Sequence, residues 1–533
     1  MLATDTSNTS IADTLQSIVG PAHVLTSAED REFYGMDVYR SLALPMAVVQ
    51  PGSVEELSQV VKAATDAGIS VVPRGGGASY TDGYLPMLES SITVDTSRLN
   101  KIVEINATDM YAVVECGVTW AELDAELKKQ GLRAPFWGPF SGLKATIGGS
   151  TSQGSLSMGT GAYGTSSESV LSMEVVLANG EIIQTGALAA HNGKPFFRSY
   201  GPDLTGLFTC DAGALGVKAR ISLRLIKRPP FKATCSFGFE DYDAMTQCLA
   251  AVARENLADI NWGLDPALQS GQLARTSAAD ARRAAFAVFK NSRNVFEGAW
   301  RLLKLAVAGK RFFDRYPYSA HFVVDGPAKA VPAAKANLLR KIASQYGAEI
   351  ANTAPTVIAA MPFIPLYPIL GPRGERWVPQ HGIMPFSKMK EIGEKLKAFY
   401  AKHQARMDAL TVYPGTMFMT VSTHAFLIEP VFYWQDERSA YHKRYLPQDY
   451  LDTLPEYPAN PQARELVAEL REGIIELFRE VGAIHMQAGK TYPYLRVRQP
   501  TAKQALEDIK RSLDPNTLMN PGALDGLNVD NKG

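Results

Sequence analysis

Cysteine is scarce in this 533-residue sequence, and the formal net charge is zero. The four cysteines are scattered, and no two of them form a C-x-x-C pair; they are Cys116, Cys210, Cys235 and Cys248. This spacing argues against a zinc site or a disulfide framework and suits a reducing compartment, so we expect a cytoplasmic protein without a metal site. The 54 basic residues balance 54 acidic ones, which gives no reason to expect a nucleic-acid partner.

Long apolar runs are also missing. No stretch of about 18 apolar residues occurs, so we expect no membrane-spanning helix. Residues 1–11 are small and polar, which predicts that no signal peptide is present. Residues 274–318 are basic and amphipathic, a composition that suits a membrane surface or a solvated helix face, and we favour the solvated face. At this length, two or more domains are expected.

Glycine, by contrast, is concentrated in particular tracts. A short apolar run ends at Pro73 and is followed by Arg74 and then by Gly75, Gly76 and Gly77. Glycine accepts positive φ and lets backbone N–H groups converge on an anion. No Gly-Lys-Ser/Thr follows, and no helix is predicted next, so this is neither a Walker loop nor a Rossmann turn. The loop predicts a phosphate or pyrophosphate ligand, and a plain tight turn is the alternative.

The flanking residues place this loop at the end of a β-α-β unit. A strand is predicted at residues 47–51, and a capping box of Ser53 and Glu56 opens a helix that Gly68 ends. Residues 69–72 then form the strand that leads into the loop, where ligands commonly bind in such units.

Three later regions are organised differently. Residues 146–165 are rich in glycine and are predicted to form a folded loop around an extended ligand. Residues 172–184 predict a β-hairpin with a turn at Asn179-Gly180. Pro229-Pro230 marks a domain boundary. Helices are expected to dominate from residue 231 to residue 480, with strands near residues 321–324 and 424–432.

Several of these tracts resemble, in order, the flavoprotein superfamily named for vanillyl-alcohol oxidase and p-cresol methylhydroxylase. The similar segments are residues 51–57, 74–79, 146–149, 163–164, 174–181 and 514–522. The resemblance covers about residues 40–228 and 480–525. It implies FAD as cofactor and an α+β fold, in which a two-part FAD-binding domain of the p-cresol methylhydroxylase type is joined to a mixed α/β cap. The expected divisions are residues 1–228 for the FAD-binding part, 229–480 for the cap and 481–533 for a returning C-terminal segment.

The same resemblance implies which residues hold FAD. They are Pro73, Arg74, Gly75, Gly76, Gly77, Ala78, Ser79, Tyr80, Thr146, Gly148, Gly149, Ser152, Gly161, Tyr163, Gly164, Gly216, Val217, His381 and Asn520. Some relatives link FAD through a histidine where this chain has Ala78, so no covalent bond is expected there. His381 resembles the flavin-linking histidine of the cap, and a hydrogen bond within the cap is the alternative.

Four residues are candidates for catalysis: His485, Lys490, Tyr492 and His424. His485 has the chemistry to accept the proton of a substrate hydroxyl, and Lys490 the charge to hold an anionic group. The alternatives are a buried structural histidine and a solvated lysine, and for His424 a core position is preferred. Candidate substrate contacts are Tyr413, Tyr433, Arg376 and Arg496.

The expected function is an FAD-dependent oxidoreductase that takes hydride from a carbon bearing a hydroxyl group, with O2 or another carrier as electron acceptor. An aromatic or phenolic alcohol is favoured because the cap is rich in aromatic residues and no H-x-H metal motif occurs. A 2-hydroxy acid dehydrogenase and an electron-passing flavoprotein subunit are the alternatives. A homodimer is one possible oligomeric state, and the sequence does not decide it.

Overall fold

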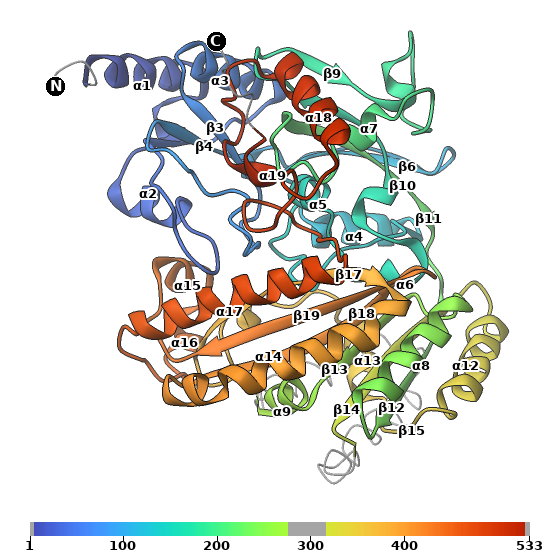
Figure 1. Cartoon of the computed structure of the whole chain (residues 1–533). Coiled ribbons are helices and arrows are strands. Elements are labelled where there is room, and N and C mark those ends of the chain that lie inside the picture. Colours follow the sequence, from blue (N-terminus) through green and yellow to red (C-terminus); the bar gives the residue numbers. More distant parts are fainter. Residues whose placement is uncertain (1–4, 275–315, 528–533) are drawn as a thin grey trace. The chain divides into compact units, whose positions relative to one another are not determined.

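The computed structural model describes residues 5–274 and 316–527 (Figure 1). The chain divides into two compact units. The N-terminal unit consists of Met1–Ser155, Ser166–Lys227 and Met486–Gly533. The cap unit consists of Leu156–Thr165 and Arg228–His485. Gly161, Tyr163 and Gly164, expected in the FAD-binding part, therefore belong to the cap unit.

The N-terminal unit contains two main sheets. In the first, the order is β1 (Val24–Leu25), β2 (Ala47–Val49), β4 (Ser91–Asp95) and β3 (Ser70–Arg74). The second, antiparallel, sheet has the order β5 (Ile102–Asn106), β6 (Tyr111–Glu115), β10 (Val217–Arg224), β8 (Val170–Val176) and β9 (Ile182–Gln184). A separate pair joins β7 (Leu132–Arg133) to β11 (Ile226–Lys227). The helices of this unit are α1 (Asp5–Val19), α2 (Ala28–Tyr34), α3 (Val54–Asp66), α4 (Trp120–Lys129), α5 (Ile147–Gln153), α7 (Leu204–Leu207), α18 (Pro500–Leu513) and α19 (Ala523–Gly526).

The predicted β-α-β unit is confirmed by β2, α3 and β3. Both strands pair in parallel with β4, which lies between them. Ser53 caps α3 by accepting a hydrogen bond from the N–H of Glu56 at 3.1 Å. The apolar face of α3, which includes Leu57, Val60 and Val61, is buried. This packing fixes the direction in which the chain leaves β3 and enters the glycine loop.

The prediction of a folded loop at residues 146–165 is wrong in part, because α5 and α6 (Thr160–Tyr163) form there. Thr146 caps α5 by accepting a hydrogen bond from the N–H of Gly149 at 3.1 Å. Gly148 packs so closely on Cys116 that a Cβ atom would overlap it. These glycines therefore permit close helix packing, which outweighs their weak intrinsic helix preference.

The cap unit is built on one eight-stranded sheet. Its strand order is β15 (Ala348–Glu349), β12 (Phe231–Phe239), β14 (Tyr318–Gly326), β13 (Ile260–Leu264), β18 (Val412–Val421), β19 (Ala425–Trp434) and β16 (Arg376–Pro379), and β17 (Gly382–Pro385) also pairs with β19. The described cap helices are α6, α8 (Tyr242–Arg254), α9 (Pro266–Ala274), α12 (Ala330–Ala343), α13 (Thr353–Ala360), α14 (Met389–Ala409), α15 (Ala440–Tyr445), α16 (Gln448–Leu451) and α17 (Pro461–Glu480).

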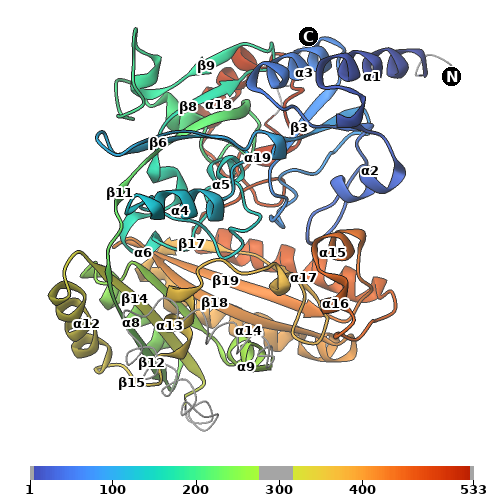
Figure 2. The same cartoon turned by 180° about the vertical axis from the view of Figure 1, so that it is seen from behind.

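Helices supply more of the described cap residues than strands do, as expected, and the strands predicted near residues 321–324 and 424–432 are β14 and β19. The remaining strands of the eight-stranded sheet were not predicted. Helices α8, α14 and α17 lie along one face of the sheet (Figure 1), and α13 lies on the other (Figure 2). On the first face, Tyr400 of α14 packs edge-on against Phe432 of β19.

Most of the basic stretch at residues 274–318 lies outside the described residues. Within the described ranges 5–274 and 316–527, no helix is both long enough and apolar enough to span a membrane.

Candidate functional site

The glycine loop directly follows β3. The Tyr84 hydroxyl donates to the carbonyl oxygens of Gly77 (2.6 Å) and Ser79 (3.1 Å), so these acceptors are satisfied within the chain. The backbone N–H groups of Gly75, Ala78 and Ser79 donate no hydrogen bond to any residue that the structure describes. N–H groups without an acceptor of their own suit the oxygens of a phosphate. The loop therefore fits the pyrophosphate of FAD.

Close packing explains why this loop needs glycine. A Cβ atom at Gly75 would overlap Oγ1 of Thr146, and one at Gly76 would overlap the carbonyl oxygen of Lys144. The loop is thus pressed against the segment that opens α5. The two glycine tracts, far apart in the sequence, form one surface in the N-terminal unit.

Arg74 anchors the base of the loop. Its guanidinium lies 4.9 Å from the ring centroid of Phe33 and 4.7 Å from that of Tyr84, and it donates to the carbonyl of Tyr34 at 2.9 Å. Arg74 is almost completely buried. These contacts fix the end of β3, where the direction of the loop is set.

The C-terminal segment adds to the same surface. The N–H of Val71 donates to the carbonyl of Leu518, and the N–H of Asn520 donates back to Val71, both at 2.8 Å. The Asn520 amide donates to the carbonyls of Gly83 and Ala212. Its Oδ1 atom is buried and has no partner among the described residues. Asn520 thus connects three segments beside the glycine loop, and its Oδ1 atom is available as a hydrogen-bond acceptor.

Lys490, Tyr492 and Arg496 also lie in the N-terminal unit. The Lys490 ammonium donates to the carbonyl of Leu85, and burial lowers the pKa of this lysine to about 7. Tyr492 is buried, and Arg496 is exposed beside Asp525 at 3.4 Å. Lys490 is therefore a partly buried amine with a backbone acceptor, and not the solvated lysine that was the alternative.

In the cap unit, His485 contacts the backbone of His381. Ile383 and Ile484 exchange two backbone hydrogen bonds, so the chain at residue 485 runs beside β17. His485 Nδ1 lies 2.7 Å from the carbonyl oxygen of His381. A carbonyl only accepts, so Nδ1 carries the proton and Nε2 keeps its lone pair. Burial lowers the pKa of His485 to about 4, which makes the ring neutral at pH 7.

His381 is fully buried, and burial holds its pKa well below the usual range, with smaller effects from His485 and Arg471. His424 differs from its expectation. It is exposed in the turn between β18 and β19, because the strand begins only at Ala425, so the preferred core position is wrong.

Tyr413 and Tyr433 are cross-strand partners on β18 and β19, and their rings stack at 5.1 Å. The Tyr413 hydroxyl donates to the buried carboxylate of Glu375 at 3.0 Å. Burial, followed by the charge of Glu375, raises the pKa of Tyr413. The structure thus brings together two predicted substrate contacts, while Arg376 lies in a separate cluster with Asp436 at 3.9 Å.

Gln380 and Glu375 were not predicted from the sequence. Gln380 is fully buried, and neither atom of its side-chain amide has a partner within the described ranges. Each lies next to a predicted site residue, Glu375 beside Arg376 and Gln380 beside His381. No group of His, Cys, Asp and Glu side chains suited to a metal ion occurs among the described residues.

Comparison with known proteins supports the assignment of the N-terminal unit. Residues 45–186 match the family model described as FAD binding domain. The glycolate oxidase subunit GlcD of Bacillus subtilis is 30% identical over 245 residues, which cover 45% of this chain and 50% of that protein. The mitochondrial D-lactate dehydrogenase [cytochrome] of Arabidopsis thaliana is 32% identical over 223 residues, covering 40% and 37%. The chain thus spans half or less of the length of these curated relatives.

Solved structures extend the comparison to the cap. p-Cresol methylhydroxylase with bound substrate aligns over 98% of both chains, with a TM-score of 0.74 and 17% identity. 4-Ethylphenol oxidase from Gulosibacter chungangensis aligns over 99% of this chain and 98% of that one, with a TM-score of 0.71 and 16% identity. These matches confirm the predicted cofactor and fold class. The chain therefore has an α+β fold that combines a FAD-binding domain of the p-cresol methylhydroxylase type with a cap.

Proposed function

We propose that this chain is an FAD-dependent oxidoreductase that oxidises an alcohol, with an aromatic or phenolic alcohol as the favoured substrate. The observation that carries this proposal is the state of His485. Its ring is neutral, its proton is fixed on Nδ1 by the carbonyl of His381, and the lone pair of the ring is therefore on Nε2.

Bound FAD supplies a hydride acceptor at N5, and oxidation of an alcohol also requires that the hydroxyl proton be removed. The loop N–H groups of Gly75, Ala78 and Ser79 would hold the pyrophosphate, and Asn520 would offer its Oδ1 atom to a donor of the cofactor. His485 Nε2 then takes the hydroxyl proton. Lys490 and Tyr492 remain candidates for the same chemistry from the N-terminal unit.

Two observations favour an aromatic or phenolic alcohol as the substrate. The solved structures that align with nearly the whole chain, cap included, are those of p-cresol methylhydroxylase and 4-ethylphenol oxidase. The stacked pair of Tyr413 and Tyr433 places two aromatic rings side by side in the cap unit. The acceptor of the electrons is O2 or another carrier.

A 2-hydroxy acid is the second candidate substrate. It is favoured by the sequence relatives, which are a glycolate oxidase subunit and a D-lactate dehydrogenase, although these cover less than half of this chain. An anaerobic screen of phenolic alcohols and 2-hydroxy acids against the visible flavin absorbance separates the two. If only 2-hydroxy acids bleach the flavin, the favoured aromatic or phenolic alcohol is wrong and a 2-hydroxy acid is the substrate.

Replacement of His485 tests the proton acceptor. His485→Ala should slow anaerobic flavin reduction by roughly 10²- to 10⁴-fold, because a general base contributes about that much. FAD content should not change, since the residue holds no cofactor in this proposal. His403→Ala, on α14 in the same unit, is the matched control. Its flavin should be reduced at the same rate as that of the unaltered protein. Equal rates for His485→Ala and the control would exclude His485 as the base.

A further inference from the structure

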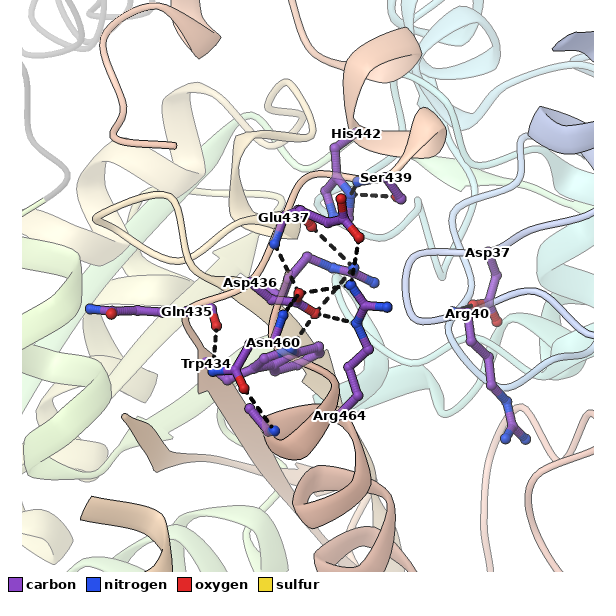
Figure 3. A network of polar contacts seen from close by, with 12 residues as sticks. Asp37, Arg40, Trp434, Gln435, Asp436, Glu437, Ser439, His442, Asn460 and Arg464 are labelled. Atoms are coloured by element: carbon purple, nitrogen blue, oxygen red, sulfur yellow. Dashed lines mark hydrogen bonds and ion pairs between the residues drawn. The ribbon is translucent and has the colours of Figure 1, made fainter. Parts of the chain in front are cut away.

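A buried polar side chain normally finds its hydrogen-bond partners within the chain, and the network around Asp436 in the cap unit is an example (Figure 3). The Asp436 carboxylate is fully buried and accepts hydrogen bonds from Trp434 Nε1 at 3.0 Å and from two nitrogens of Arg464 at 2.6 and 2.8 Å. Two amide side chains of the N-terminal unit differ from this pattern. They are Gln153, the last residue of α5, and Asn520, in the segment between α18 and α19.

Both amides lie against Gly83. The side-chain nitrogen of Asn520 donates to the carbonyl oxygens of Gly83 at 2.8 Å and of Ala212 at 2.5 Å. A carbonyl only accepts, so these two contacts fix which atom of the Asn520 amide is the nitrogen. The amide of Gln153 packs directly on Gly83, because a Cβ atom added to that glycine would overlap Nε2 of Gln153. Two distant segments of the chain thus bring their amides to one glycine.

The oxygen atoms of these two amides have no donor. Oε1 of Gln153 and Oδ1 of Asn520 are buried, and neither accepts a hydrogen bond from any residue that the structure describes. The backbone of both residues is held, since the N–H of Gln487 donates to the carbonyl of Gln153 at 2.7 Å and the N–H of Asn520 donates to Val71 at 2.8 Å. A buried acceptor without a donor is unfavourable, so a ligand that brings two donors would stabilise this arrangement.

The same residues connect this pair of acceptors to the cofactor loop. The hydroxyl of Ser79, in the loop, donates to Oε1 of Gln487 at 2.9 Å, and Gln487 is bonded through its backbone to Gln153. The N–H of Lys490 donates to the carbonyl of Thr81 at 3.0 Å, between the loop and Gly83. Gln153 and Asn520 therefore belong to the surface on which the glycine loop, α5 and the C-terminal segment meet.

The chemistry of FAD limits which of its parts fits two acceptors. The pyrophosphate carries only acceptors at pH 7, and the flavin ring carries a single N–H group. The ribityl chain and the ribose of the adenosine half both carry hydroxyl groups on neighbouring carbons, and both are attached directly to the pyrophosphate. A hydroxyl group donates one hydrogen bond, so two neighbouring hydroxyl groups match two amide oxygens.

We propose that Gln153 and Asn520 position bound FAD by accepting hydrogen bonds from hydroxyl groups of its ribityl chain or of its adenosine ribose. Gln153 is thereby a cofactor-positioning residue that was not among those expected from the sequence. The proposal rests on FAD as the cofactor and not on the proposed alcohol oxidation. It is tested without turnover, so its failure would leave the proposed reaction untouched.

Release of FAD from the loaded protein, followed as the rise of flavin fluorescence after dilution, tests the role of Gln153. Gln153→Met removes the acceptor and nearly keeps the length of the side chain. It should release FAD roughly 10- to 100-fold faster, because one hydrogen bond to a buried group is lost. Gln504→Met, which alters an exposed glutamine of α18, should release FAD at the rate of the unaltered protein. Equal rates for Gln153→Met and the unaltered protein would overturn the proposal.

Two cofactor analogues identify the hydroxyl groups. One has an unsubstituted pentyl chain in place of the ribityl chain, and the other has 2′,3′-dideoxyribose in the adenosine half. If the ribityl chain is the donor, Gln153→Met should speed release of the dideoxyribose analogue as it does that of FAD, and should leave release of the pentyl analogue unchanged. The opposite result would assign the adenosine ribose.

The analogues also keep the proposal testable without the variant. The unaltered protein should release one of the two analogues faster than FAD. Equal release of FAD and both analogues from the unaltered protein would overturn the proposal even if Gln153→Met did not fold. If Gln153→Met speeds the release of both analogues as much as that of FAD, hydroxyl groups are excluded as the donors.

Discussion

At the scale of single residues, Gly76 shows how tightly the cofactor loop is packed. A Cβ atom at this position would overlap the carbonyl oxygen of Lys144. We expect Gly76→Val to displace the loop and to yield protein without FAD, as measured by visible absorbance after purification.

Gly131→Ala is the control for this substitution. Gly131 has a φ of 65°, and a Cβ atom there would meet nothing within 4 Å. The variant should lose about 1 kcal/mol of stability through backbone strain and should keep its FAD. Retention of FAD by Gly76→Val would contradict the assignment of the loop.

Asp37 should give the protein a pH-dependent stability. It is buried, and one of its oxygens accepts the N–H of Asp82 at 2.9 Å. Burial, and then the charge of Asp82, raises the pKa of Asp37 from 3.8 to about 7. Between these values the folded protein binds the proton more tightly than the unfolded chain does. The contribution of Asp37 to stability is therefore present below about pH 4 and is lost as pH rises to about 7.

The neighbouring groups do not reverse this sign. Arg40 forms two hydrogen bonds with Asp82 and stays charged, and the lowered pKa of Lys490 acts only above about pH 7. In Asp37→Asn, the free energy of unfolding should therefore fall less between pH 5 and pH 7 than in the unaltered protein. Urea unfolding at the two pH values measures this difference. An unchanged pH dependence would show that Asp37 ionises normally.

At the scale of elements, α18 is held to the N-terminal unit by a buried ion pair. Lys510 donates to Asp514 at 2.6 Å and to the backbone carbonyls of Ala214 (2.7 Å) and Met519 (3.1 Å). Both side chains are at least 98% buried. The pair thus fixes the turn that leads to Asn520, which lies beside the glycine loop.

Asp514→Asn leaves the Lys510 ammonium buried without its carboxylate. Removing one partner of such a pair costs about 3–5 kcal/mol, and we expect a loss of this size in urea unfolding. Asp508→Asn, which breaks an exposed pair with Arg511 on the same helix, should change stability by less than about 1 kcal/mol. Similar losses for the two variants would mean that burial of the pair matters little.

At the scale of the whole molecule, the chain passes four times between the two units, after residues 155, 165, 227 and 485. The N-terminal unit is therefore completed only by its last segment, which begins at Met486. That segment supplies Leu518 and Asn520 to β3 and Lys490 to the loop before β4.

A chain that ends at His485 should consequently fail to retain FAD, although it keeps the whole glycine loop. Expression of residues 486–533 as a second chain should restore the flavin absorbance in part. A chain that ends at Leu527 is the control and should bind FAD normally. Full FAD content in the shorter chain would show that the C-terminal segment does not support the cofactor site.

The sequence by itself determined the local features: the cap of α3, the β-α-β unit and the glycine loop. These depend on neighbouring residues, so spacing was enough to reveal them. FAD as cofactor was implied by the resemblance of several tracts, in order, to a flavoprotein superfamily. Only the tertiary structure decided the eight-stranded cap sheet, the helix at residues 147–153 and the exposed position of His424. The fixed tautomer of His485 was also decided there. In each of these cases, burial and partners from distant segments set the outcome, and no local pattern in the chain records them.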